Sequence, residues 1–324
     1  MGKIHFLVLL ISFDITISCK EKKPDTIEIT NLATEPPKDY ETVSFLGVAL
    51  KRLEFPESTK ASLDSNLQVA KENLLRDSVE NNYIWYGRRL AYLMRYNDAI
   101  EIYTLGLKSF PDSHRLLRHR GHRYITTRRL GLAINDLKRA SELIQGTQDQ
   151  IEPDGAPNKF NIPLSTDHFN IWYHLGLAYY LKQDFEDALI AYEECMKVSN
   201  NNDLLIATTD WYYMTLRRLG KTKRAEALLK PITEDMEILE NTSYHKRLMF
   251  YKGIYQSNDL LSVDSLRDDN DLTLLTQGYG LGNWYFYNGK MEEARNTFDK
   301  VIEGQNWAAF GFIAAEVEIF HWKP

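Results

Sequence analysis

The apolar residues of this chain recur with the period of an α-helix. Beginning at Val43, they include Leu63, Leu67, Ala70 and Leu74, which follow one another at spacings of three and four residues. That spacing places them on one face of a helix. The pattern predicts an all-α chain, with helices over residues 43–78 that precede a longer array.

A pair of small residues also recurs along the chain. Glycine and alanine lie twelve residues apart in Gly87 and Ala99, and the first two such pairs are displaced from each other by 34 residues. Two antiparallel helices can cross closely where each carries a small residue. The repetition predicts an array of helical hairpins, marked by the further pairs Gly121 and Ala133, Gly176 and Ala188, and Gly282 and Ala294.

Residues 161–200 resemble the tetratricopeptide repeat (TPR), a unit of two antiparallel helices. The resemblance rests on Trp172, Leu175, Gly176, Tyr179, Phe185, Ala188, Tyr192 and Cys195. The other repeats are less complete, and the fourth has Tyr213 where the family has a small residue. The resemblance covers about residues 79–304 and implies five repeats stacked into a right-handed superhelical solenoid that binds other proteins. The chain also looks like TPR lipoproteins of Bacteroidetes-type bacteria.

These patterns divide the chain into nine segments. They are a signal peptide (1–19), a flexible tether (20–42), N-terminal helices (43–78), repeats one and two (79–147), an insertion loop (148–165), repeats three and four (166–240), a linking helix and loop (241–270), repeat five (271–304) and a C-terminal capping helix (305–324). The insertion contains Pro153 and Gly155 and is longer than an ordinary helix connection, so it is either functional or a tolerated addition.

The N-terminus predicts export. Lys3 precedes an apolar run that is too short to span a bilayer, as in a secretory signal. The end of this run, Ile17 to Cys19, resembles a bacterial lipobox, although Asp14 and Thr16 depart from the usual pattern. We therefore expect lipid attachment at Cys19, localisation in the cell envelope, and membrane contact only through that anchor. An ordinary cleaved signal, or a buried N-terminal strand or helix, is the alternative.

Charge and missing motifs narrow the function. The net charge of −6 argues against nucleic-acid binding. The chain contains no Gly-rich phosphate loop, no G-x-S-x-G sequence and no H-E-x-x-H sequence, so we expect neither an enzyme nor a cofactor. Its two cysteines rule out a disulfide framework, and Cys195 takes a small packing position. One local excess of charge remains, with six arginines within fifteen residues at 115, 118, 120, 123, 128 and 129.

The resemblance implies that the first helix of each repeat lines the concave side of the solenoid. On that register the lining is cationic at one end and aromatic or amide-bearing at the other. Guanidinium groups form bidentate hydrogen bonds with carboxylates, so the lining predicts a protein or acidic peptide as partner. The expected groove residues are Arg88, Arg115, Arg118, His119, His122, Asn170, Tyr173, His174, Asp210, Trp211, Arg217, Tyr279, Asn283 and Tyr287.

Three alternatives remain at this point. The arginines could pair with acids of the chain itself, such as Glu101 or Asp136. The groove could instead hold a small anion or a metal, with or without catalysis, through the Arg/His cluster. A purely architectural protein could self-associate through its convex face. The residues that would serve a metal are His119, His122 and His174, with Glu152, Asp154 and His168 of the insertion as further ligands.

Overall fold

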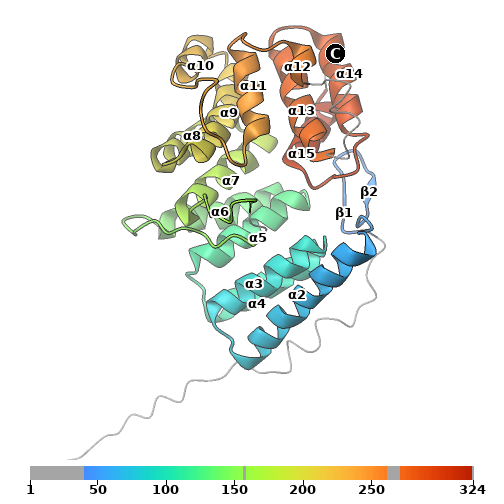
Figure 1. Ribbon diagram of the computed structural model, residues 1–324, viewed down its shortest axis with the longest axis vertical. Coiled ribbons are helices and arrows are strands. Elements are labelled where there is room, and N and C mark those ends of the chain that lie inside the picture. The colour runs from blue at the N-terminus through green and yellow to red at the C-terminus, as the bar shows by residue number, and fades with distance from the viewer. Residues whose placement is uncertain (1–39, 156–157, 261–270, 323–324) are drawn as a thin grey trace, which may run out of the picture.

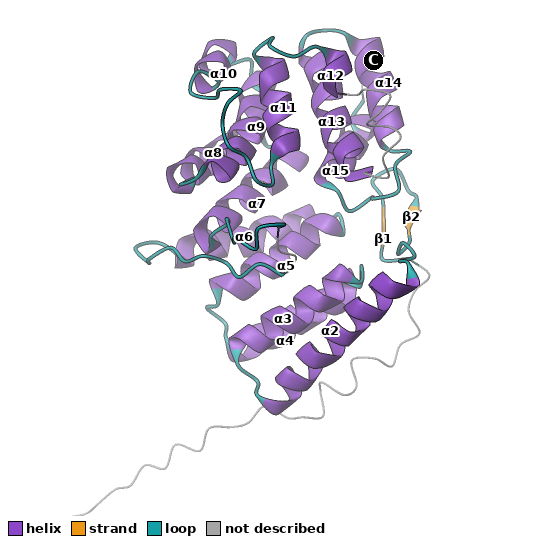
Figure 2. Ribbon diagram, viewed as in Figure 1, coloured by secondary structure: helices purple, strands orange, loops and turns teal. Residues whose placement is uncertain are grey.

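A computed structural model describes residues 40–155, 158–260 and 271–322 of the chain (Figure 1). The predicted signal peptide, Cys19 and nearly all of the predicted tether lie outside these residues, as does the segment 261–270. Regular structure in the described part is almost entirely helical (Figure 2). No helix there is both long enough and apolar enough to cross a membrane.

Five helical hairpins stack along the described part of the chain, which confirms the predicted all-α hairpin solenoid. They are α3 (Glu80–Tyr92) with α4 (Tyr96–Ser109), α5 (His114–Thr126) with α6 (Leu130–Leu143), α7 (Asp167–Leu181) with α8 (Phe185–Val198), α9 (Asn202–Arg218) with α10 (Thr222–Leu228), and α13 (Asp271–Tyr287) with α14 (Met291–Val301). The flanking helices are α2 (Glu57–Arg76), α11 (Thr242–Tyr251), α12 (Ser257–Leu260) and α15 (Phe310–Phe320).

The recurring glycine has a more specific purpose than its spacing suggested. In each of the four pairs it faces a large side chain one helical turn beyond the paired alanine, namely Tyr103, Leu137, Tyr192 or Phe298. A Cβ atom on Gly176 would lie 2.7 Å from Tyr192 Cε1, and one on Gly282 would lie 2.6 Å from Phe298 Cε1. The alanines themselves are fully buried. The glycine therefore makes room for a packed side chain of the second helix.

The turn inside each hairpin has the same backbone form. One residue has a positive φ angle, between 56° and 75°, in all five turns: Met94, Arg128, Gln183, Gly220 and Gly289. Non-glycine residues adopt this region rarely, so its recurrence marks five equivalent hairpins, including the fourth. That fourth hairpin has a short second helix, because α10 has 7 residues whereas α4, α6 and α8 each have 14.

The helix predicted from residue 43 is wrong over its first residues. Thr42–Val43 (β1) and Ala49–Leu50 (β2) instead form a short antiparallel hairpin. Its turn is fixed by Gly47 at φ +82° and by the Ser44 hydroxyl, which accepts the backbone N–H groups of Leu46 and Val48. The apolar spacing in this short run fits a helix equally well, and the turn residues decide the outcome.

The two ends of the described chain meet. In Figure 1 the β1–β2 hairpin lies beside the C-terminal helices. The Phe45 amide donates a hydrogen bond to the Glu316 carboxylate, whose other oxygen lies 2.7 Å from Arg128 Nη2. Trp307 Nε1 donates to the Lys51 carbonyl oxygen at 2.6 Å. Helix α15, expected only to cap the last repeat, therefore also contacts the β1–β2 hairpin and the turn of the second helical hairpin.

Candidate functional site

The insertion places one carboxylate among four of the predicted groove residues. Glu152 Oε2 lies 3.3 Å from Arg118 Nε and accepts a hydrogen bond from Asn170 Nδ2 at 3.0 Å. Glu152 Oε1 lies 3.8 Å from Arg88 Nη1 and 3.7 Å from His119 Nε2. The Glu152 side chain is only 6% exposed. The chain therefore supplies its own acidic group to the arginines that were expected to bind a partner.

The backbone on both sides of this carboxylate is also tied down. Arg88 Nη1 donates to the Pro153 carbonyl oxygen at 2.6 Å, and Arg89 Nη1 donates to the Gly155 carbonyl oxygen at 3.3 Å. The insertion therefore rests against α3 over several residues. The sequence had offered Glu152 as a metal ligand, and no pattern in it indicated this ion pairing.

The three histidines near this cluster are neutral packing groups. His119 Nδ1 accepts a hydrogen bond from Arg118 Nη1 at 2.9 Å, and His174 Nδ1 donates to the Asn170 carbonyl oxygen at 2.6 Å. Burial, reinforced by nearby arginines, holds the pKa of His119, His122 and His174 well below the usual value. The rings of His122 and His174 lie 4.3 Å apart. Within the described residues, no group of three or more His, Cys, Asp or Glu side chains is arranged to hold a metal ion.

At the opposite end, the predicted groove residues belong to the protein interior. Asp210 and Trp211 are at most 1% exposed. Arg247 Nη2 of α11 lies 2.9 Å from Asp210 Oδ2. Burial raises the pKa of Asp210 to about 7, and the attraction of Arg247 limits that rise. A partner cannot reach these side chains in this structure, because α11 covers the face of α9 on which they lie.

Tyr279 and Asn283 of α13 are enclosed as well. Both are fully buried, and both hydrogen-bond to the Tyr180 hydroxyl, at 2.8 and 2.9 Å. Their expected role in contacting a partner is therefore corrected. They join the inner face of α13 to α7 and close this part of the groove.

The remaining predicted groove residues lie near the surface and already have neighbours. Arg115 Nη1 lies 3.3 Å from Glu80 Oε2. The Arg217 guanidinium lies 4.3 Å from the centre of the Tyr287 ring and donates to Asn288 Oδ1 at 3.1 Å. The suggestion that some arginines pair with acids of the chain also holds for Arg120, which forms two hydrogen bonds with Asp136.

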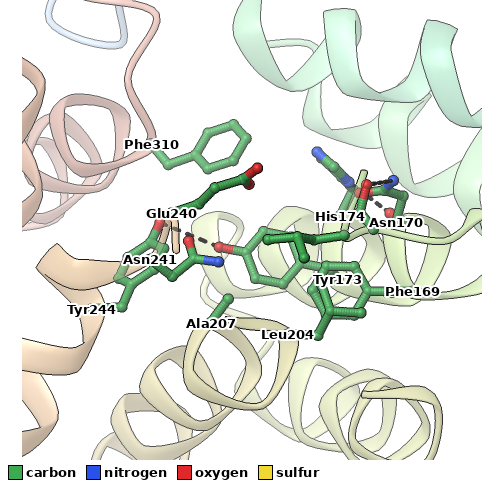
Figure 3. A pocket seen from close by; sticks show the side chains of 12 residues that line it. Phe169, Asn170, Tyr173, His174, Leu204, Ala207, Glu240, Asn241, Tyr244 and Phe310 are labelled. Atoms are coloured by element: carbon green, nitrogen blue, oxygen red, sulfur yellow. Dashed lines mark hydrogen bonds between the residues drawn. The ribbon is translucent and has the colours of Figure 1, made fainter. Parts of the chain in front are cut away.

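A pocket of about 280 Å³ remains open on the inner side (Figure 3). It lies between α7, α9, the start of α11 and the first residue of α15. Three of the predicted groove residues, Asn170, Tyr173 and His174, contribute to its wall. The other residues that line it are Leu164, Ser165, Phe169, Leu204, Ala207, Glu240, Asn241, Tyr244 and Phe310. Sequence reasoning missed this second set, because no local pattern showed that α11 and α15 fold over the array.

One buried carboxylate fixes the edge of the pocket. Asp203, near the N-terminus of α9, accepts the backbone N–H groups of Leu239, Glu240 and Asn241 at 2.8 to 2.9 Å. Charge-assisted bonds of this kind are stronger than neutral ones. Opposite this edge, the Tyr173 hydroxyl donates to the Tyr244 hydroxyl at 3.3 Å. The pocket wall is therefore held by specific contacts from three segments.

The described part of the chain is a helical-hairpin solenoid with an open pocket on its inner side. Two of its hairpins match models of the tetratricopeptide repeat, over residues 169–202 and 278–303, so the chain contains TPR units. No curated protein matches it. Among solved structures it is similar to YrrB, described as a TPR protein with an unusual peptide-binding site, at 12% identity and a TM-score of 0.40, covering 73% of this chain and 92% of that one. A tetratricopeptide repeat protein from Parabacteroides merdae ATCC 43184 is similar at 15% identity and a TM-score of 0.47, covering 80% of this chain and 94% of that one.

Proposed function

We propose that this protein is an interaction scaffold that anchors a partner protein or peptide through a side chain inserted in the inner pocket. The observation that supports this proposal is the pocket of about 280 Å³, whose lining includes Tyr173, Tyr244 and Phe310. Aromatic side chains of this kind dominate the energetics of protein interfaces. The volume is just below the roughly 300–1,000 Å³ of sites for drug-sized molecules, which favours one or two side chains over a cofactor. On this proposal the protein binds its partner and catalyses no reaction.

An acidic group is a second candidate ligand, at a different place. Two guanidinium groups, Arg88 and Arg118, face the single carboxylate of Glu152, and Arg123 is close enough to Arg118 to feel its charge. An acidic peptide or a small anion would bind there by displacing Glu152. Replacing Glu152 with alanine should then raise the affinity for a peptide that ends in two glutamates, and unchanged affinity would remove this candidate.

We also propose that the protein is exported and tethered to the cell envelope through a lipid on Cys19. The tether is the segment between Cys19 and β1, and it ends before the predicted residue 42, because Glu41 is buried and Thr42 begins β1. The support is the sequence pattern alone. Mass spectrometry of the membrane fraction from the native host should find a diacylglyceryl cysteine at the mature N-terminus. An intact Met1 in the mature protein would contradict export.

The pocket is tested by filling it. Peptides selected from a phage-displayed random library on the full-length protein should bind the wild type with micromolar affinity. Ala207 is 4% exposed and lies in the pocket wall, so Ala207→Phe should occupy the space and weaken binding at least about tenfold. The matched control is Ala61→Phe on the exposed face of α2, which should leave binding unchanged.

Circular dichroism and thermal melting establish that both variants fold. Selected peptides that bind Ala207→Phe as tightly as the wild type would locate the docking site elsewhere. A library that gives no specific binder would count against peptide recognition altogether.

A further inference from the structure

We infer that the side chain received by the pocket is a long cation, a lysine or an arginine of the partner. This inference rests on the proposed docking role of the pocket. Glu240 supplies the charge, and the rings of Tyr173, Tyr244 and Phe310 supply part of the wall. This inference gives the partner a chemistry opposite to the acidic character expected from the arginine-rich sequence.

Glu240 is the charged group of the pocket wall. Its carboxylate extends toward the interior of the pocket in Figure 3. Oε1 accepts a hydrogen bond from Asn158 Nδ2 at 2.6 Å, whereas Oε2 has no hydrogen bond within the described residues. His174 also lines the pocket, and burial keeps its pKa well below the usual value, so it adds no positive charge. A cation that enters the pocket therefore meets one negative charge with an open oxygen.

The aromatic wall suits the rest of such a side chain. Tyr173, Tyr244 and Phe310 lie around the same space (Figure 3). Lysine and arginine lay their aliphatic stems along apolar surface, and their charged ends are attracted to the faces of aromatic rings. The hydrogen bond between the Tyr173 and Tyr244 hydroxyls keeps both rings in place before a ligand arrives. The pocket is therefore preorganised for an apolar stem that ends in a positive charge.

Other side chains fit less well. An acidic side chain would face Glu240. Arg118, whose charge acts on His174 of the pocket wall, is already engaged by Glu152. A neutral aliphatic chain of the same length would gain the stem contacts but not the ion pair. The pocket should therefore prefer a cation over its neutral isostere, and the neutral isostere over an acid.

The test compares five peptide libraries on the full-length protein. Each library is a fluorescent pentapeptide mixture with randomised flanks and a fixed central residue: arginine, lysine, norleucine, glutamine or glutamate. Fluorescence polarisation should show the arginine and lysine libraries binding about five-fold tighter than the norleucine library, with the glutamate library weakest. Glu240→Gln should abolish that difference. The matched control is Glu237→Gln, an exposed acid of the same connection that does not line the pocket.

The outcomes separate this inference from the docking role. If Ala207→Phe weakens all five libraries while norleucine equals arginine on the wild type, the pocket binds side chains but the cation preference is wrong. If Glu237→Gln lowers the preference as much as Glu240→Gln does, the effect is one of net charge, and the inference is also wrong. If Ala207→Phe changes nothing, the docking role itself fails.

Discussion

Replacing Glu152 with glutamine should destabilise the protein, because it removes the charge that neutralises a buried arginine cluster. The substitution keeps the size and shape of the side chain. It also keeps an oxygen that can accept the hydrogen bond from Asn170. The decrease in the free energy of unfolding therefore measures mainly the ion pairs with Arg88 and Arg118.

The structure sets the magnitude. The side chains of Glu152, Arg118 and Arg88 are 6, 10 and 11% exposed, so solvent screens them little. Removing one partner of a buried pair costs about 3–5 kcal/mol, because the other charge is left uncompensated. The separations of 3.3 and 3.8 Å exceed those of ideal charge-assisted bonds, which points to the lower end of that range. We expect the free energy of unfolding to fall by about 3 kcal/mol.

Urea denaturation, followed by circular dichroism, measures this change. The control is Glu142→Gln on the exposed face of α6, which should alter the free energy of unfolding by less than about 0.5 kcal/mol. A double-mutant cycle with Arg118→Met isolates the pair, and its coupling energy should be at least about 1 kcal/mol. A Glu152→Gln variant as stable as the control, or a coupling energy near zero, would show that the insertion does not neutralise the cluster.

Two further predictions concern the stability of the folded core. In the folded protein the pKa values of His119 and His174 lie well below the usual value, whereas in the unfolded chain both residues take up a proton near pH 6.5. The free energy of unfolding should therefore fall below that pH, by up to about 1.4 kcal/mol per pH unit for each histidine. Urea melts at pH 7.5 and 5.5 measure the difference. A constant stability over this range would contradict their burial as neutral groups. Gly176→Ala should destabilise by about 1–2 kcal/mol through its clash with Tyr192. Gly131→Ala, where a Cβ meets open space, should be neutral or slightly stabilising, and urea melts of both glycine variants would measure the difference.

The fold was predictable because its determinants are local. A glycine, an alanine twelve residues later and the turn between them lie within one hairpin, so a single stretch such as residues 161–200 contains a complete unit. The β1–β2 hairpin was not predictable in this way. Its few apolar residues fit either period, and the outcome depends on the turn at Gly47 and on contacts with Glu316.

The candidate site was predictable only in part. Helical register placed Arg88, Arg118 and His119 on the first helices of their repeats, and in the structure all three lie near Glu152. Helical register could not predict the acid that pairs with these arginines, because Glu152 lies in a loop without periodicity. The closure of the groove depends on still longer-range contacts. Arg128 and Glu316 are 188 residues apart, and no repeat pattern carries information over that distance.

The departure of the fourth repeat from the family pattern explains where the groove ends. Tyr213 takes the position of the usual small residue, and its ring stacks on Tyr251 of α11 at 4.6 Å. About one turn earlier on the same helix, Asp210 pairs with Arg247 of α11. The inner face of α9 therefore packs against α11, a helix outside the regular array. The start of α11 places Tyr244 in the pocket wall. A large residue at the small-residue position thus marks the repeat after which α11 interrupts the regular array, and the pocket lies at that boundary.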